Sequence, residues 1–156
     1  MKIRLIWTGK TADAYLDKGI AIYQSRLKHY CRFDIQTLPD IKNAKSLSKE
    51  ELKEREGKQL LDALAPQDIL VLLDETGKTY TSPQLADFVQ KLLNRGGTIV
   101  FVIGGAYGFS QEVYNRADTK LSLSPLTFSH QMVRLIFAEQ LYRAFTIMKG
   151  EPYHHG

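Results

Sequence analysis

The segment Thr98–Ile103 reads Thr-Ile-Val-Phe-Val-Ile and continues directly into Gly104-Gly105-Ala106-Tyr107-Gly108. The unbroken run of β-branched and aromatic residues predicts a strand that is buried on both faces of a sheet. Three glycines within five residues allow the backbone to turn sharply and to approach a ligand closely. We therefore expect the functional centre of the protein at the end of this strand.

A second irregular stretch, Leu123-Ser124-Pro125-Leu126-Thr127-Phe128, follows a short strand expected near residues 120–123. Ligands of α/β sheets bind outside the carboxyl ends of strands, so two such ends predict a cleft. The stretch is apolar except for Ser124 and Thr127. It fits a buried connection that fills the core. It also fits an apolar slot for a flat ring such as adenine, whose polar atoms would meet backbone groups.

Strand and helix patterns alternate along the whole chain. Strands are expected at 3–7, 33–38, 69–73, 98–103 and 120–123, and helices at 12–30, 48–65, 82–94, 110–117 and 130–149. This alternation predicts an α/β fold with a mostly parallel sheet and helices on both faces. A length of 156 residues indicates a single domain, 1–156. Ser48 and Glu51 have the spacing of a capping box, and Gly57 within the same helix indicates close packing there, since glycine costs roughly 1 kcal/mol relative to alanine.

Composition narrows the class of protein. The 44% hydrophobic and 24% charged residues are ordinary for a globular protein. A net charge of +4 slightly favours a polyanionic partner such as nucleic acid, although many enzymes share this balance. The single cysteine, Cys31, excludes an internal disulfide and offers no metal-site spacing, so we expect no metal. The charged start does not resemble a signal peptide and no apolar run could span a bilayer, so we expect a cytoplasmic protein without a membrane partner.

The last expected helix is apolar nearly all round. Such a helix must be buried on two sides. A second copy of the chain is the cover that we favour, which predicts a homodimer; a central helix between the sheet and another helix is the alternative. The apolar residues are Val133, Phe137, Leu141, Ala144 and Met148 on one face, with Met132, Leu135, Ile136, Tyr142 and Ile147 beside them.

Polar residues near the end of the chain are candidates for chemistry. Arg134 and Arg143 could contact phosphates, and His130 or His154 could move protons or bind RNA. Each has an ordinary alternative: a surface ion pair such as Arg143 with Glu139 at i,i+4, or a solvated imidazole. The terminal Tyr-His-His would ordinarily be a frayed end. The glycine loop lacks both the dinucleotide fingerprint and the Gly-Lys-Ser/Thr of a phosphate loop.

Five short sequence segments occur in a fixed order along the chain, and the set is more specific for a protein family than any one segment. As a set they resemble the bacterial RlmH (YbeA-like) family of ribosomal RNA methyltransferases, and the likeness covers essentially the whole chain. One departure is Ser129, where the family often has proline, so the loop before the last helix is expected to be less rigid. The segments are Leu73-Asp74-Glu75-x-Gly77-Lys78, Ile103-Gly104-Gly105-x-x-Gly108, Leu123-Ser124-x-Leu126-Thr127-Phe128-x-His130, Arg134-x-x-x-x-Glu139-Gln140-x-Tyr142-Arg143-Ala144 and Tyr153-His154.

The resemblance implies a SPOUT-type fold with a C-terminal trefoil knot that holds S-adenosylmethionine, and a homodimer. It implies N3 methylation of a pseudouridine in 23S rRNA on the assembled ribosome. The resemblance also implies which residues would contact the cofactor. They are Leu73, Gly104 and the run Leu123, Ser124, Pro125, Leu126, Thr127 and Phe128. The knot cannot be reached from the element pattern, because general topology rules would exclude it.

Methylating the N3 of a uracil-type ring requires removal of its proton, and a histidine suits that task. His154 is the candidate base, with Tyr153 helping to place the target base. His130, Arg134 and Arg143 are the candidate substrate contacts, since RNA phosphates require basic groups. We expect the tail to order over a cofactor site, its own or the partner's, when RNA arrives. A non-catalytic RNA-binding factor of ribosome assembly and a nucleotide-binding regulator are the alternative functions.

Overall fold

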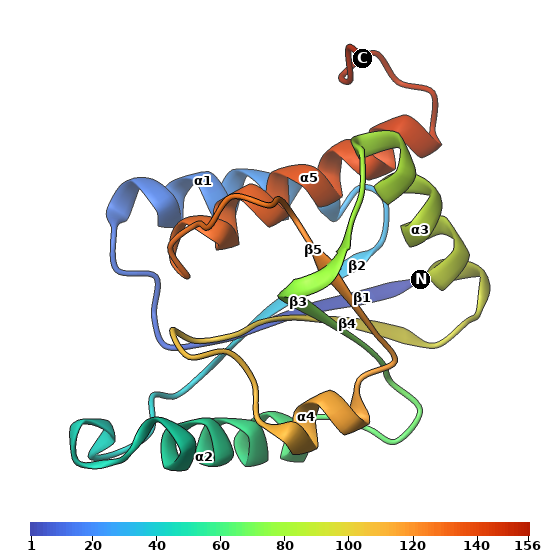
Figure 1. Ribbon diagram of the computed structural model, residues 1–156. Helices are drawn as coiled ribbons and strands as arrows, with labels where there is room; N and C mark the ends of the chain where they lie inside the picture. The colour runs from blue at the N-terminus through green and yellow to red at the C-terminus, as the bar shows by residue number, and fades with distance from the viewer.

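The computed structural model describes residues 1–156 and contains one five-stranded sheet (Figure 1). The strand order is β2-β1-β4-β3-β5, and every neighbouring pair is parallel. The predicted parallel α/β fold is therefore confirmed. The strands are β1 (Lys2–Thr8), β2 (Arg32–Leu38), β3 (Ile69–Thr79), β4 (Thr98–Ile103) and β5 (Thr119–Ser122).

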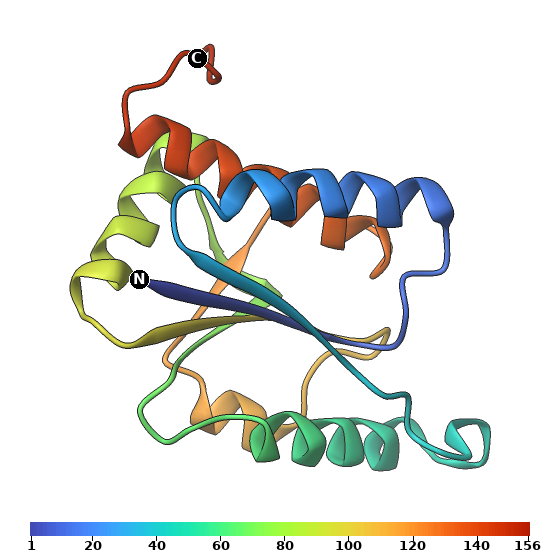
Figure 2. The same cartoon turned by 180° about the vertical axis from the view of Figure 1, so that it is seen from behind.

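Helices cover both faces of this sheet. Figures 1 and 2 show α1, α3 and α5 on one face and α2 and α4 on the other. A short 3₁₀ turn, Ala44–Ser46, interrupts the expected surface loop before α2. The helices are α1 (Ala14–Leu27), α2 (Lys49–Asp62), α3 (Ser82–Asn94), α4 (Gln111–Arg116) and α5 (Met132–Met148).

The central strand β4 contributes side chains to two hydrophobic cores, as its continuous apolar sequence predicted. Ile99, Phe101 and Ile103 point into the larger core beneath α1, α3 and α5. Val100 and Val102 point into the smaller core beneath α2 and α4. Side chains alternate across a strand, so only a run without polar positions can fill both cores. The end of β4 is consequently held from both sides.

Strand β3 runs further than expected. The apolar pattern predicted an end at Leu73, but the strand continues to Thr79, and that predicted end was wrong. Pairing with β5 resumes after a register shift, with Lys78 opposite Leu121. Gly77 permits this approach, because an added Cβ would lie 2.7 Å from the backbone of Leu121. A polar strand segment of this kind leaves no apolar pattern in the sequence.

Helix α2 packs closely against the start of α4, as its glycine predicted. A Cβ on Gly57 would lie 2.5 Å from the hydroxyl oxygen of Ser110. The predicted capping box is present, with Ser48 accepting from the Glu51 amide and Glu51 accepting from the Ser48 amide. Both features fix the position of α2 beneath the end of β4.

Helix α5 lies between α1 and α3 on the sheet (Figures 1 and 2). Its Phe137, Leu141 and Phe145 are buried in the larger core. Other apolar residues, including Val133, Ile136 and Tyr142, remain half-buried. The central position accounts for much of the apolar surface, and the predicted homodimer stays a prediction. None of the helices combines the length and apolar character needed to cross a membrane.

Candidate active site

A cleft of about 880 Å³ lies where β4 and β5 end, beside the middle of β3. Three chain segments, residues 73–76, 103–109 and 122–130, supply most of its lining. The structure thus brings together every residue predicted to contact a cofactor, from Leu73 and Gly104 to the run 123–128. His130 lies at the same cleft. The predicted position of the cleft is confirmed, and its volume lies within the range of small-molecule sites.

The glycine loop after β4 is a tight turn that also forms one wall of this cleft. The amide of Gly108 donates to the carbonyl of Gly105 over 3.2 Å, and Gly108 has a φ of +79°. A Cβ on Gly104 would lie 3.0 Å from the ring of Phe109. Glycine is therefore required at both ends of the turn, for different reasons: backbone conformation at Gly108 and close packing at Gly104.

The loop 123–128 is open to the cleft. Pro125, Leu126 and Thr127 are exposed, Leu126 at 73% of its surface. The interpretation of this loop as a buried core connection was wrong. Its shape is held by Ser124, whose side-chain oxygen accepts from the Leu126 amide, and by Ser122, which donates to the Ser124 carbonyl. An exposed apolar loop beside a cleft offers a surface for a flat apolar ligand.

Acidic and phenolic groups from β3 and α4 also line the cleft. The Tyr114 hydroxyl donates to a carboxylate oxygen of Asp74 over 2.8 Å, and Glu75 lies next to it along β3. Burial, reinforced by Asp74, raises the pKa of Tyr114 to about 12, so the phenol remains a donor at neutral pH. The cleft therefore presents carboxylates to its ligand, which favours a positively charged one. Sequence reasoning did not identify this acidic side.

Arg134 is not on the surface. Its side chain is 1% exposed, and its guanidinium donates to the carbonyls of Thr8 and Gly9 and to the Thr11 hydroxyl, at 2.9 to 3.0 Å. It also lies 4.7 Å above the ring of Trp7. A guanidinium engaged in this way holds the β1–α1 loop and is not free to bind a phosphate. In this geometry Arg134 positions the loop. It therefore fits neither of the two roles expected from the sequence, a phosphate contact or a surface ion pair.

Gln131 reinforces the same connection. Its side chain donates to the Lys10 carbonyl and accepts from the Ala12 amide, at 3.2 and 2.9 Å. The first turns of α5 are thereby fastened to the loop between β1 and α1. Because these partners are about 120 residues apart in the chain, no local pattern in the sequence could reveal them.

The C-terminal tail is docked along the second half of α5. Glu139 accepts from both Arg143 and the Tyr153 hydroxyl at 2.9 Å, so the expected i,i+4 pair is present. Arg143 also contacts Nδ1 of His154 at 3.1 Å and covers the ring of Tyr153. Tyr153 packs edge-on against Tyr142. The tail is therefore not the frayed end that was its ordinary alternative, because these contacts hold it in place.

The Arg143 contact determines the tautomer of His154 in this conformation. Arginine can only donate, so Nδ1 must accept and the neutral ring carries its proton on Nε2. Sequence reasoning had placed Arg143, Tyr153 and His154 in related roles without predicting that they touch. The structure joins these three residues in one network, in which Glu139 accepts from Arg143 and Tyr153, and Arg143 contacts His154.

The tail leaves the C-terminal end of α5 (Figure 1) and folds back along its second half, where Tyr153 reaches Glu139 and His154 reaches Arg143. His130 and Val133, at the start of the helix, line the cleft. No residue of the tail lines it. Within one chain, the predicted catalytic residues are therefore not brought to the predicted cofactor residues. The structure contains no cluster of three or more side chains able to hold a metal ion.

Comparison with known proteins places this geometry in context. A family model described as "Predicted SPOUT methyltransferase" matches residues 1–154. The ribosomal RNA large subunit methyltransferase H of Christiangramia forsetii is 52% identical over 156 residues, and that of Flavobacterium psychrophilum is 54% identical; each match covers 99% of both chains. A methyltransferase of Legionella pneumophila, solved in complex with its cofactor SAM, matches with a TM-score of 0.50 at 14% identity. That match covers 93% of this chain and 66% of the other, and it supports the fold alone.

Proposed function

Because the chain belongs to the SPOUT methyltransferase family, we propose that it transfers a methyl group from S-adenosylmethionine to the ribosomal RNA of the large subunit. The structural observation that supports this best is the single cleft formed by Leu73, the glycine loop and residues 122–130. The proposal extends to N3 of a pseudouridine in 23S rRNA on the assembled ribosome in the cytoplasm. It treats residues 1–156 as one methyltransferase domain with the family's trefoil knot.

The cleft suits the parts of S-adenosylmethionine. The exposed apolar run 125–127 offers a surface for adenine, and the glycine loop lets backbone groups approach the ligand. Asp74 and Glu75 provide negative charge opposite the positive sulfonium. When bound, the cofactor supplies the methyl group and its own leaving group. The protein then has to align the methyl carbon with the attacking nitrogen and exclude water.

The proton on the target nitrogen needs an acceptor, for which we propose His154. In the docked tail its Nδ1 accepts a hydrogen bond from Arg143. To act as a base, the imidazole must exchange that bond for one to the target nitrogen. Tyr153 anchors the tail through Glu139 and Tyr142, so it positions the imidazole. Near-neutral proton transfer by a positioned histidine contributes about 100-fold or more to a rate.

We propose a homodimer that completes this site. In a two-fold dimer, antiparallel α5 helices would put the tail of one copy near the cleft of the other. The half-buried apolar residues of α5 supply surface for such a contact. Sedimentation at micromolar concentration should then give a mass near twice 17.8 kDa. A stable monomer at that concentration would remove this part of the proposal.

Complementation between two impaired variants tests the shared site directly, at a cofactor concentration too low to occupy the Gly104→Val cleft. A Gly104→Val chain then keeps its tail but has an empty cleft, whereas a chain ending at Glu151 keeps its cleft but loses its tail. If the tail acts on the partner's cleft, co-expression should restore about one quarter of the wild-type rate, because half of randomly paired dimers are mixed and each mixed dimer has one complete site. No recovery would mean that the tail serves its own cleft.

RNA contacts are proposed at both ends of the shared site, His130 at the cleft and Arg143 beside the tail. Arg134 was also predicted as a substrate contact, and its burial favours an indirect role through the β1–α1 loop. The formal charge of +4 per chain gives +8 for two chains, a modest attraction for RNA. Recognition of shape on the ribosomal surface has to supply the remaining specificity.

Two measurements distinguish this function from its alternatives. Calorimetric titration with S-adenosylmethionine should show binding, which an RNA-binding assembly factor without a cofactor would not. Transfer of labelled methyl from S-adenosylmethionine to ribosomes lacking the modification should follow, which a nucleotide-binding regulator would not catalyse. Assembled ribosomes should be methylated faster than isolated 23S rRNA. Binding without transfer to either RNA would overturn the proposal.

A further inference from the structure

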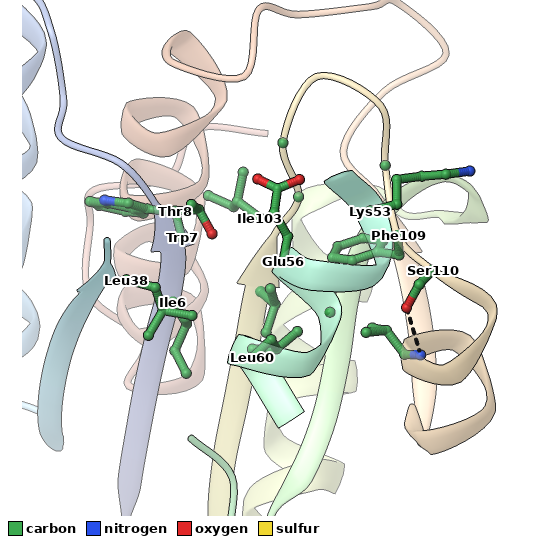
Figure 3. Close-up of a pocket in the computed structure, with 16 residues that line it drawn as sticks. Ile6, Trp7, Thr8, Leu38, Lys53, Glu56, Leu60, Ile103, Phe109 and Ser110 are labelled. Atoms are coloured by element: carbon green, nitrogen blue, oxygen red, sulfur yellow. Dashed lines mark hydrogen bonds between the residues drawn. The ribbon is translucent and has the colours of Figure 1, made fainter. Parts of the chain in front are cut away.

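The glycine loop separates two cavities. On one side lies the cleft described above; on the other lies a small cavity of about 20 Å³ between β1, β4 and α2 (Figure 3). Gly104, Gly105, Gly108 and Phe109 line both. The small cavity has room for about one water molecule. Only the loop therefore stands between the cleft and the groups on α2.

Glu56 is the acidic group in the small cavity. Figure 3 shows its carboxylate turned toward the end of β4, next to Ile103. The two carboxylate oxygens lie 3.2 and 3.4 Å from the place where a Cβ on Gly105 would be, so the missing side chain lets the charge reach the loop. No hydrogen bond or ion pair joins this half-buried carboxylate to another protein group. Burial, with a further contribution from Asp40, raises its pKa.

Helix α2 holds this carboxylate firmly against the loop. Its Gly57 packs on Ser110, just beyond the loop, and its Lys49 lies 5.1 Å from the ring centre of Tyr107 within the loop. An unpaired, partly buried carboxylate is costly to a fold, because lost hydration is not replaced. A rigid helix that places such a group behind a ligand-binding loop indicates a use for its charge.

We propose that Glu56 is a positioning residue that acts through the glycine loop to favour S-adenosylmethionine over S-adenosylhomocysteine. The inference rests on the proposed function, because it requires this cofactor in the cleft. The sulfonium of S-adenosylmethionine carries a positive charge. Transfer of the methyl group leaves that sulfur as a neutral thioether. A fixed carboxylate behind the loop attracts the first ligand and not the second, across a partly dry region in which charges interact strongly. It thus strengthens binding of the cofactor without strengthening binding of the product.

Several other charged groups face the loop, and their effects on ligand binding have to be distinguished from the effect of Glu56. Acidic groups in the cleft attract the same sulfonium, and a protonated histidine there repels it. The comparison between wild type and a Glu56 variant isolates the contribution of the one carboxylate. The groups are Asp40 from the β2–α2 connection, Lys49 and the Glu50-paired Lys53 on α2, and Asp74, Glu75 and His130 in the cleft.

Calorimetry on the Glu56→Gln variant tests the inference, because glutamine keeps the shape and removes the charge. S-adenosylmethionine should bind at least about fivefold more weakly, while S-adenosylhomocysteine stays within about twofold of wild type. Glu54→Gln is the matched control, since Glu54 is exposed on the same helix, and it should change neither affinity. Equal weakening of both ligands would show that Glu56 only shapes the loop, and no change would also overturn the inference.

The pH dependence of this preference, compared between wild type and Glu56→Gln, gives a second test. Because the pKa of Glu56 is raised, its charge and the attraction it provides are lost as the pH falls through that pKa. The preference for S-adenosylmethionine over S-adenosylhomocysteine should shrink on acidification, and less steeply in Glu56→Gln. A preference with the same pH dependence in both proteins would overturn the inference. Absence of any cofactor binding by wild type would instead overturn the proposed function.

Discussion

The two ends of α5 are built in different ways. At its start, Gln131 and Arg134 bind backbone groups of the β1–α1 loop, and the residues just before them open into the cleft. Along its second half, side chains bind one another in a network centred on Glu139. The start fixes the path of the main chain around a cavity, and the second half fixes a short tail on a surface. In the proposed function, ligand binding belongs to the start of α5 and proton transfer to the tail along its second half.

The same contrast appears in its two arginines, which are nine residues apart. Arg134 is buried and satisfies backbone carbonyls, whereas Arg143 is partly exposed and contacts Glu139 and His154. A buried cation that bridges distant parts of the chain is costly to remove. A partly exposed cation in a side-chain network contributes little stability and remains available to a substrate.

The largest effect is expected from Arg134→Met. Removing the guanidinium leaves the Thr8 and Gly9 carbonyls without partners in a buried setting, at a cost of about 1 to 3 kcal/mol of unfolding free energy for each carbonyl. Urea unfolding followed by circular dichroism measures the loss. Arg143→Met is the matched variant on the same helix and should lose no more than about 1 kcal/mol. Similar losses for both arginines would show that the contrast between the two ends is not energetic.

The fold was largely predictable, and the exceptions have common causes. Buried apolar runs located β1 and β4, and helical spacing located α2 and α5, because those patterns record which faces meet the core. The strand order was not predictable, since pairing partners lie far apart in the chain. The polar continuation of β3 was not predicted for a related reason. Its pairing with β5 depends on Gly77 and on a register shift, and neither produces a hydrophobic pattern in the sequence.

The site was predictable where glycines and loops mark it. Gly104 and residues 123–128 meet at the cleft because both segments follow strands that end at one edge of the sheet. Arg134 was misplaced because its partners are backbone carbonyls about 125 residues away. Glu56 was missed because its neighbour, Gly105, marks only the absence of a side chain. The proximity of a carboxylate to a glycine in a distant segment cannot be inferred from the sequence alone.

Removal of the tail tests the C-terminal end. A chain ending at Glu151 should fold and bind S-adenosylmethionine within about twofold of wild type, because no tail residue lines its own cleft. Single-turnover methyl transfer to ribosomes should fall at least about 100-fold, as expected for loss of a positioned acid–base group. His154→Ala alone should reproduce much of that loss. A rate equal to wild type would mean that the tail docks without taking part in the reaction.

Gly104→Val tests the other end. The new Cβ would meet the Phe109 ring at 3.0 Å, and the branched side chain would force the loop or the ring into the cleft. We expect at least about tenfold weaker binding of S-adenosylmethionine, or about 1.4 kcal/mol. Titration calorimetry measures it, with circular dichroism to confirm the fold. Unchanged affinity in a folded variant would place the cofactor elsewhere.

The smallest effect is expected from Tyr153→Phe, which separates anchoring from proton transfer. The phenol donates to Glu139, and burial raises its pKa well above the ordinary range, so it stays protonated wherever the protein is active. Phenylalanine keeps the contacts with Tyr142 and Arg143 and loses one hydrogen bond, worth about 1 kcal/mol. Methyl transfer should therefore fall only about threefold to fivefold, with the pH profile unchanged between pH about 7 and 9.

A much larger loss in Tyr153→Phe would reverse the assignment of roles within the tail. If the rate fell about 100-fold, as expected for His154→Ala, the phenolic oxygen itself would be needed at the reacting nitrogen. The raised pKa opposes that role, because a phenol that holds its proton cannot accept another at neutral pH. Single-turnover rates of the two variants, measured side by side on ribosomes, decide between them. Since Tyr153 contacts Glu139 through its hydroxyl and Tyr142 through its ring, a small effect would also indicate that the docked tail is held by its rings more than by its hydroxyl.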